Sequence, residues 1–174
     1  LAPTVIPQFC FVDNRAPWNR LDYENDLAAL KAWIVAREGA PLYLWLYNGF
    51  PASVGHSSGF HCFPGFFAHT IGEQFKLFAK GNVRGLFFCG YGQEVESYVT
   101  FKLMDDPSLD VDTLLDEYFG RQYGAAAEPM KKLYLAIEET YSNPANYPEA
   151  IASGKASSHQ TAEMAWNWLG TESR

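Results

Sequence analysis

The feature that most constrains this chain is an unbroken alternation of aliphatic and aromatic side chains over residues 42–48, Leu-Tyr-Leu-Trp-Leu-Tyr-Asn. A period of two is typical of a β-strand with two different faces. We therefore expect the three leucines on one face and the rings of Tyr43, Trp45 and Tyr47 on the other. The next helical pattern begins only near Phe66, whereas a strand and the helix after it are usually joined by about 2 to 6 residues. A connection this long, rich in Gly, His and aromatic residues, predicts a loop that either shapes a site or is disordered.

The aromatic strand face and the loop after it together indicate a carbohydrate-binding site. The apolar C–H faces of sugars stack on Trp and Tyr rings, while indole and phenol edges bind hydroxyl groups. Asn48, at the end of the strand, carries an amide that both donates and accepts, which suits a 2-acetamido group. A plain aromatic core strand and a turn asparagine are the structural alternatives, and the strand pattern alone favours neither interpretation.

Strands and helices alternate three times, which predicts an α/β fold with parallel strands joined by right-handed crossovers. Asp22 or Asn25 is the expected N-cap of the first helix, and Gly39 is its expected C-cap. Residues 4–12, 42–48 and 83–89 are the expected strands, and residues 27–34, residues 66–80 and those from about 93 onward fall in the expected helices.

After these units the apolar residues recur only at helical spacing, so we divide the chain into residues 1–106 and residues 107–174. Asp110 is the expected N-cap of the first helix in the second part, and Pro129 suits the first turn of the next helix. The remaining expected segments are a link rich in Pro, Ala and Ser over residues 143–158 and a final helix over residues 159–169.

Composition excludes several classes of function. Hydrophobic residues make up 48% of the 174 positions without a long uncharged apolar run, so we expect one compact domain and no membrane span. The net charge of -7 and the lack of a Lys/Arg cluster argue against a nucleic-acid partner, because a phosphate backbone needs a basic surface. Cys10, Cys62 and Cys89 are odd in number and widely spaced, which indicates free buried thiols. No cofactor is expected.

Five motifs carry a resemblance to a known family. They are Asn-Val-Arg-Gly-Leu-Phe-Phe at 82–88, Tyr-Val-Thr-Phe-Lys-Leu-Met-Asp-Asp-Pro at 98–107, Leu-Asp-Val-Asp at 109–112, Glu-Tyr-Phe at 117–119 and Tyr-Gly-Ala-Ala-Ala at 123–127. With them the chain resembles, from about Leu42 onward, the C-terminal part of a large bacterial family described as domain of unknown function 4838. Some members of that family are grouped with glycoside hydrolases, including retaining endo-β-N-acetylglucosaminidases that act on N-glycans.

The resemblance implies that the chain holds roughly the last three strand–helix units of a (β/α)8 barrel, followed by a helical region. In barrel hydrolases that cleave 2-acetamido sugars the catalytic carboxylates usually lie nearer the middle strands, which implies an acid upstream of Leu1. Because the chain does not begin with Met, we expect a piece of a longer protein, which the resemblance implies is periplasmic or secreted, with no signal peptide in this segment. Many relatives carry an acidic or amide residue after the third of these strands. This chain departs from that pattern with Phe88-Cys89-Gly90, which argues against catalysis at that strand end.

Barrel active sites form at the C-terminal ends of the strands, which here correspond to residues 13–18, 47–65 and 90–94. Asp13 and Glu94 are therefore the catalytic candidates, although Asp is also a common turn residue and a helix dipole alone explains Glu at a helix start. A retaining hydrolase needs two carboxylates about 5 to 5.5 Å apart, and no local spacing in this sequence guarantees such a pair. The substrate-binding candidates are Trp18, Trp45, Tyr47, Asn48, His61 and Tyr91.

The expected function is the substrate-binding wall of a glycoside hydrolase that acts on glycans with N-acetylhexosamine, a wall that is inactive without the longer parent protein. A non-catalytic carbohydrate-binding or scaffold module is one alternative. A metal site is another, because imidazole and thiolate bind zinc, although the spacing fits no familiar zinc signature, and one of the histidines could instead line the sugar pocket. Open edges of a three-stranded sheet further predict homo-oligomers or aggregation. The residues of the metal alternative are His56, His61, Cys62 and His69.

Overall fold

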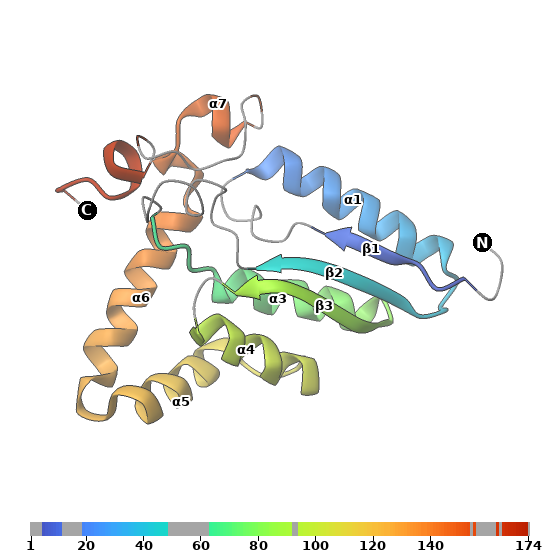
Figure 1. Ribbon diagram of the computed structural model, residues 1–174, viewed down its shortest axis with the longest axis horizontal. Coiled ribbons are helices and arrows are strands. Elements are labelled where there is room, and N and C mark those ends of the chain that lie inside the picture. The colour runs from blue at the N-terminus through green and yellow to red at the C-terminus, as the bar shows by residue number, and fades with distance from the viewer. Residues whose placement is uncertain are drawn as a thin grey trace.

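The structure is a computed structural model that describes residues 5–11, 19–48, 63–91, 94–153, 155, 163 and 165–173. Three strands form a parallel sheet in the order β1-β2-β3, and helices account for most of the other residues (Figure 1), which confirms the expected α/β pattern. The strands are β1 (Gln8–Phe11), β2 (Leu42–Asn48) and β3 (Val83–Tyr91). The helices are α1 (Arg20–Ala36), α3 (Ala68–Lys80), α4 (Glu94–Asp105), α5 (Val111–Tyr123), α6 (Ala127–Ser142) and α7 (Glu149–Ala152), with the short turns η2 (Gly124–Ala126), η3 (Pro144–Asn146) and η4 (Ala165–Leu169).

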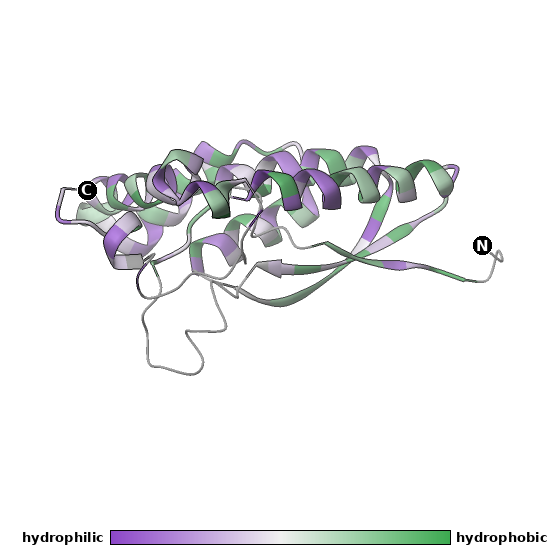
Figure 2. Cartoon of the chain, turned by 90° about the horizontal axis from the view of Figure 1, so that it is seen from above, coloured by the Kyte–Doolittle hydropathy of each residue, from purple (hydrophilic) through white to green (hydrophobic). Residues whose placement is uncertain are grey.

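The helices lie on one side of the sheet, as Figure 2 shows. Leu42, Leu44 and Leu46 of β2 belong to the buried core and are 0%, 0% and 1% exposed. Tyr43, which lies between two of these leucines, is only partly buried. Alternate side chains of a strand point to opposite faces, so the leucines face the helices and the rings face away from them. The predicted two-faced strand is therefore confirmed.

The first strand–helix unit has different boundaries from those expected. β1 covers four residues within the predicted range 4–12, and α1 begins at Arg20. The N-cap is Asn19, whose side chain accepts a hydrogen bond from the backbone N–H of Asp22 at 3.1 Å, so the prediction of Asp22 or Asn25 as the cap was wrong. The error arose because the apolar stripe starts only in the second turn, whereas the first turn of the helix is mostly polar.

The C-terminal end of α1 also differs from the prediction, because Arg37 and not Gly39 is its C-cap. Glu38 and Gly39 follow with positive φ angles of 50° and 83°, the left-handed conformation that glycine adopts readily. Gly39 therefore belongs to the turn between the helix and β2. The sequence signal located this turn correctly and misplaced the cap by two residues.

In the second unit α3 begins at Ala68, two residues after the predicted start. Phe66 and Phe67 are buried but not helical, since Phe67 has a φ of -153°. Phe67 has no capping side chain of its own, and its backbone N–H donates to Oε1 of Glu96 in α4 at 3.0 Å. The helix ends at Lys80, before Gly81, as predicted. Its N-terminus is therefore fixed by a contact from another helix rather than by a local capping residue.

β3 continues to Tyr91, two residues beyond the predicted strand, and α4 then begins at Glu94, close to the predicted start near Gln93. The extension arises because Tyr91 pairs with Asn48 of β2 after an irregularity in the register. Glycine at position 90 interrupts the apolar run in the sequence, so the run alone could not show that pairing continues.

Two expected features of the helical region are confirmed. Asp110 caps α5 by accepting a hydrogen bond from the backbone N–H of Thr113 at 2.9 Å, and Pro129 lies in the first turn of α6. The predicted link over residues 143–158 contains two short helical segments, η3 and α7, and η4 lies within the predicted final helix.

One hydrophobic core joins the helical region to the strand–helix units. The ring of Phe66 meets the ring of Tyr134 in α6 edge to face, with a centroid distance of 5.4 Å, and Phe67 stacks on Tyr141 at 6.0 Å. The division into residues 1–106 and 107–174 stays a prediction. Among the helices of the described chain, none is long and apolar enough to span a bilayer.

Candidate functional site

The face of the sheet that points away from the helices gathers side chains from all three strands, and we call it the open face. Pairing places Cys10 of β1 opposite Trp45 of β2, and Trp45 opposite Phe87 of β3. Neighbouring strands lie about 4.8 Å apart, so side chains at paired positions on one face come into contact. The residues of the open face are Gln8, Cys10, Tyr43, Trp45, Tyr47, Gly85, Phe87 and Cys89.

The aromatic rings of the open face contact one another. The ring centroids of Trp45 and Phe87 are 4.3 Å apart with an interplanar angle of 49°, and those of Trp45 and Tyr47 are 6.3 Å apart with an angle of 32°. Phe87 is 47% exposed, although it lies in the middle of a strand. Aromatic pairs are favourable at centroid distances of about 4.5 to 7 Å, a range that includes the Trp45–Tyr47 pair, and Trp45 and Phe87 are slightly closer. The face thus presents a strip of three neighbouring rings.

The ring of Tyr43 extends this strip, because the residue opposite it on β3 is Gly85. A Cβ atom placed on Gly85 would lie 2.4 Å from Cδ1 and 2.5 Å from Cε1 of Tyr43. The ring of Tyr43 therefore occupies the space above Gly85 that a side chain at this position would fill. Only glycine leaves room for a ring this close to the neighbouring strand.

Two polar groups accompany the rings of the open face. The indole Nε1 of Trp45 is buried and has no hydrogen-bond partner among the described residues. A hydrogen bond with the thiol of Cys10 raises the pKa of Tyr47, and burial and the nearby Cys89 add to this effect. A phenol is protonated at neutral pH, and a raised pKa keeps Tyr47 in this form at higher pH, so its O–H is available as a hydrogen-bond donor.

Both described cysteines, Cys10 and Cys89, carry free thiols, as predicted. The expectation that they are buried was wrong for Cys10, which is exposed, while Cys89 is partly buried. The reason is their position on the open face, since a cysteine in an apolar strand is buried only where another layer covers that face. The third cysteine, Cys62, lies outside the described residues.

The acidic candidate Glu94 begins α4 and is exposed. Glu94 lies near phenol groups of the helical layer, as its effect on Tyr134 shows. Burial and then the nearby Tyr123 raise the pKa of Tyr134 to about 12, and the negative charge of Glu94 makes a smaller contribution in the same direction. Glu96 is fully buried and binds the backbone of Phe67, which gives it a structural role at the start of α3. None of the described side chains on the open face is a carboxylate.

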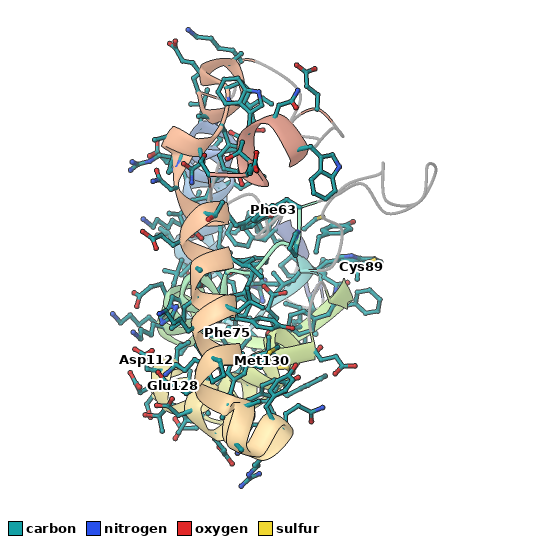
Figure 3. All side chains as sticks on the ribbon, turned by 90° about the vertical axis from the view of Figure 1, so that its left-hand side faces the viewer. Phe63, Phe75, Cys89, Asp112, Glu128 and Met130 are labelled. Carbon is teal, nitrogen blue, oxygen red and sulfur yellow. The ribbon has the colours of Figure 1, made fainter. Side chains whose placement is uncertain are left out.

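His69, the one described residue of the metal alternative, lies among the helices. Its Nδ1 is 2.6 Å from Oε2 of Glu138 in α6, and its Nε2 is 3.6 Å from Oδ1 of Asp112 in α5. Figure 3 shows Asp112 and Cys89 on opposite sides of the molecule, so this histidine is remote from the open face. Within the described ranges, no three His, Cys, Asp or Glu side chains are arranged to hold a metal ion.

Several predicted site residues cannot be compared with the structure. The side chains of Asn48 and Tyr91 lie outside the described atoms, although their backbones are paired at the ends of β2 and β3. The structure thus brings together Trp45, Tyr47 and the strand ends of Asn48 and Tyr91, and it places His69 on the opposite side of the helices. Glu94 begins α4 three residues after Tyr91, close to the end of β3 in the chain. The candidates wholly outside the described residues are Asp13, Trp18, His56, His61 and Cys62.

Sequence reasoning missed Phe87, Gly85 and the two cysteines as members of the same face. The run Val-Arg-Gly-Leu-Phe-Phe-Cys at 83–89 is almost uniformly apolar, so its alternation is not visible. The parallel register with β2 provides the missing signal, because it pairs Gly85 with Tyr43 and Phe87 with Trp45.

Comparison with known proteins gives one family and no individual relative. A family model with the description Domain of unknown function (DUF4838) matches residues 2–136, which is most of the chain. No curated protein and no solved structure matches the chain.

Proposed function

The chain belongs to the family Domain of unknown function (DUF4838), and we propose that it supplies part of the substrate-binding wall of a glycoside hydrolase. The observation that carries the proposal is the ring strip of the open face, formed by Tyr43, Trp45, Tyr47 and Phe87. These rings contact one another and face away from the helices. A sheet face of this kind offers a flat apolar surface of the size of a few sugar rings.

The polar groups on this face favour a neutral, hydroxyl-rich ligand. No described residue of the open face carries a full charge, which argues against phosphate or carboxylate ligands. The phenol of Tyr47 is a donor at the edge of these rings, and Nε1 of Trp45, which has no partner among the described residues, is a second donor just beneath the surface. A sugar that stacks on the indole would present hydroxyl or acetamido oxygens to such donors.

The barrel architecture is the finer part of the proposal. Three parallel strands with helices on one face have the arrangement of a sector of a (β/α)8 barrel, in which the open face would become the interior. Trp45, Tyr47 and Asn48 lie in the C-terminal half of β2, where barrel enzymes hold their substrates. In this arrangement the remaining strands would complete the wall around the glycan.

Catalysis needs more than the described residues of this chain provide. Retaining cleavage uses a carboxylate pair, or one carboxylate that assists a substrate acetamido group. Glu94 lies beside the tyrosines of α5 and α6, and Asp13 stays a candidate outside the described residues. We therefore assign binding to the open face and assign the catalytic acids to positions outside the described residues.

The test is calorimetric titration of the 174-residue chain with oligosaccharides of N-acetylglucosamine. Trp45→Ala should weaken binding at least tenfold, because losing a stacked indole removes about 1.4 kcal/mol or more. Trp45→Phe keeps an apolar ring without the Nε1 donor and should lose less affinity than the alanine variant.

Trp166→Ala is the matched control, since Trp166 is 58% exposed in η4 and does not belong to the open face. It should leave binding unchanged. Equal affinity of the native chain and Trp45→Ala, or no binding of any such oligosaccharide, would contradict the proposed role of the open face.

A non-catalytic carbohydrate-binding module is the second candidate, and the lack of a described carboxylate on the open face favours it. The two functions differ in the behaviour of the longer parent protein. A module would retain glycans on a column without cleaving them, whereas a hydrolase would release a reducing sugar. Product analysis after prolonged incubation separates the two functions.

A further inference from the structure

His69, in the first turn of α3, joins three helices through one imidazole ring. A single carboxylate, that of Glu138 in α6, receives both the backbone N–H of His69 at 2.9 Å and the ring Nδ1 at 2.6 Å. The other ring nitrogen, Nε2, lies 3.6 Å from Oδ1 of Asp112 in α5. The backbone contact also satisfies one of the free N–H groups at the helix start.

The surroundings of this ring are mainly acidic. The side chain of Glu138 is only 10% exposed, whereas those of His69 and Asp112 are 45% and 62% exposed. Lys131 of α6 lies 3.8 Å from Asp112 and 2.6 Å from Asp116, so it neutralises part of the negative charge of α5. The charged groups that face the ring are Glu138 on α6, and Asp112 and Asp110 on α5. Lys131 on α6 and Asp116 on α5 lie beyond Asp112, Lys76 on α3 acts on Asp110, and Glu96 on α4 binds the neighbouring backbone of Phe67.

We propose that His69 is a pH-sensitive clamp that holds the start of α3 against α5 and α6. In the protonated ring, Nδ1–H donates a hydrogen bond to Glu138, and the positively charged ring attracts the carboxylate of Asp112 through Nε2–H. When the ring loses a proton to solvent, the 2.6 Å contact with Glu138 keeps the hydrogen on Nδ1. The bare Nε2 lone pair then faces a carboxylate oxygen, so the contact with α5 weakens while the contact with α6 remains.

The direction of the pH effect follows from linkage. A hydrogen bond to Glu138 raises the pKa of His69, burial opposes this, and the charges of Glu138 and Asp112 raise the pKa further. A histidine whose folded pKa lies above its unfolded value near 6.5 stabilises the fold fully below that value. This contribution is lost as the pH rises through the folded pKa. The clamp is therefore closed below about pH 6.5 and opens as the pH rises through the higher folded pKa.

The test follows the ring protons of His69 by NMR during a pH titration of the full chain, with His69→Gln used to identify the signal. The native ring should titrate above pH 6.5. Asp112→Asn removes an exposed charge and should lower the titration midpoint. Glu138→Gln should lower it further, since a glutamine amide accepts the same backbone N–H yet can donate to Nδ1 and so favours the neutral ring.

Urea unfolding between pH 6 and pH 9 provides the second measurement. The native chain should lose stability over this range, and His69→Gln should lack that loss, while His159→Gln controls for the removal of one imidazole. If Glu138→Gln does not fold, the titration midpoints of the native chain and of Asp112→Asn still test the proposal. A native midpoint at or below 6.5, or the same pH dependence for His69→Gln and the native chain, overturns the proposal.

Discussion

Both faces of β2 carry large side chains with apolar surface, yet they differ in what covers them. Leu42, Leu44 and Leu46 lie beneath the helices with almost no exposed surface. On the opposite face Trp45 and Phe87 contact each other at 4.3 Å, and Phe87 remains 47% exposed. Alternation in a strand therefore identifies two faces but does not show which of them another layer covers.

This difference separates the stabilising face of the strand from the face for which we propose a binding role. Burial of apolar area stabilises the folded chain in proportion to the area removed from water, so the leucine face holds the fold together. The open face contributes less in this way, because part of its apolar area, such as that of Phe87, stays exposed to solvent. Substitutions on the two faces should consequently have unequal effects on unfolding.

The largest effect is expected for Leu44→Ala, which leaves a cavity under the helices. Leucine-to-alanine changes in a packed core cost about 2 to 5 kcal/mol of unfolding free energy. Urea unfolding followed by far-ultraviolet circular dichroism measures this loss. Leu133→Ala in α6 is the matched control, because Leu133 is 52% exposed and should change stability by less than about 0.5 kcal/mol. Similar losses for the two variants would show that burial on the leucine face does not dominate.

The leucine face was predictable from sequence because the pattern of β2 is local and regular. The role of Asp110 as an N-cap was predictable for the same reason, because its side chain binds a backbone N–H only three residues further along the chain. The start of α3 was not predictable, because its backbone N–H groups are bound by Glu96 and Glu138, far along the chain. Local patterns reveal elements, whereas contacts between distant helices decide where those elements begin.

A medium effect is expected for Gly85→Ala on the open face. The new Cβ would lie within 2.5 Å of the Tyr43 ring, so the ring must move, and overpacking of this kind costs about 1 to 3 kcal/mol. Gly120→Ala is the control, because a Cβ at Gly120 meets nothing within 4 Å and alanine suits the interior of α5 better than glycine.

The double variant Tyr43→Ala/Gly85→Ala extends this test. If the ring causes the loss, adding Gly85→Ala to a chain that already carries Tyr43→Ala should cost much less than adding it to the native chain. Equal costs in the two backgrounds would show that the strain lies in the backbone of β3 and not between the two side chains.

The open face as a whole was only partly predictable. Trp45 and Tyr47 were found from their own alternation, whereas Gly85 and Phe87 join them only through the parallel register of β3. A uniformly apolar strand gives no sign of which side chains share a face. The acidic partners of His69 were missed for a similar reason, since Glu138 lies 69 residues further along the chain.

The smallest effect is expected for Phe87→Thr, which removes one ring from the open face and keeps a residue that favours strands. The loss should be about 0.5 to 1.5 kcal/mol, the contribution of one aromatic pair, because much of the ring is already exposed. Sedimentation at several protein concentrations should show weaker self-association of this variant, as expected if uncovered apolar faces and free edges drive oligomers. The comparison would be contradicted if Phe87→Thr lost as much unfolding free energy as Leu44→Ala and if this loss increased with protein concentration. Such a result would mean that a second copy of the chain buries the open face as fully as the helices bury the leucines.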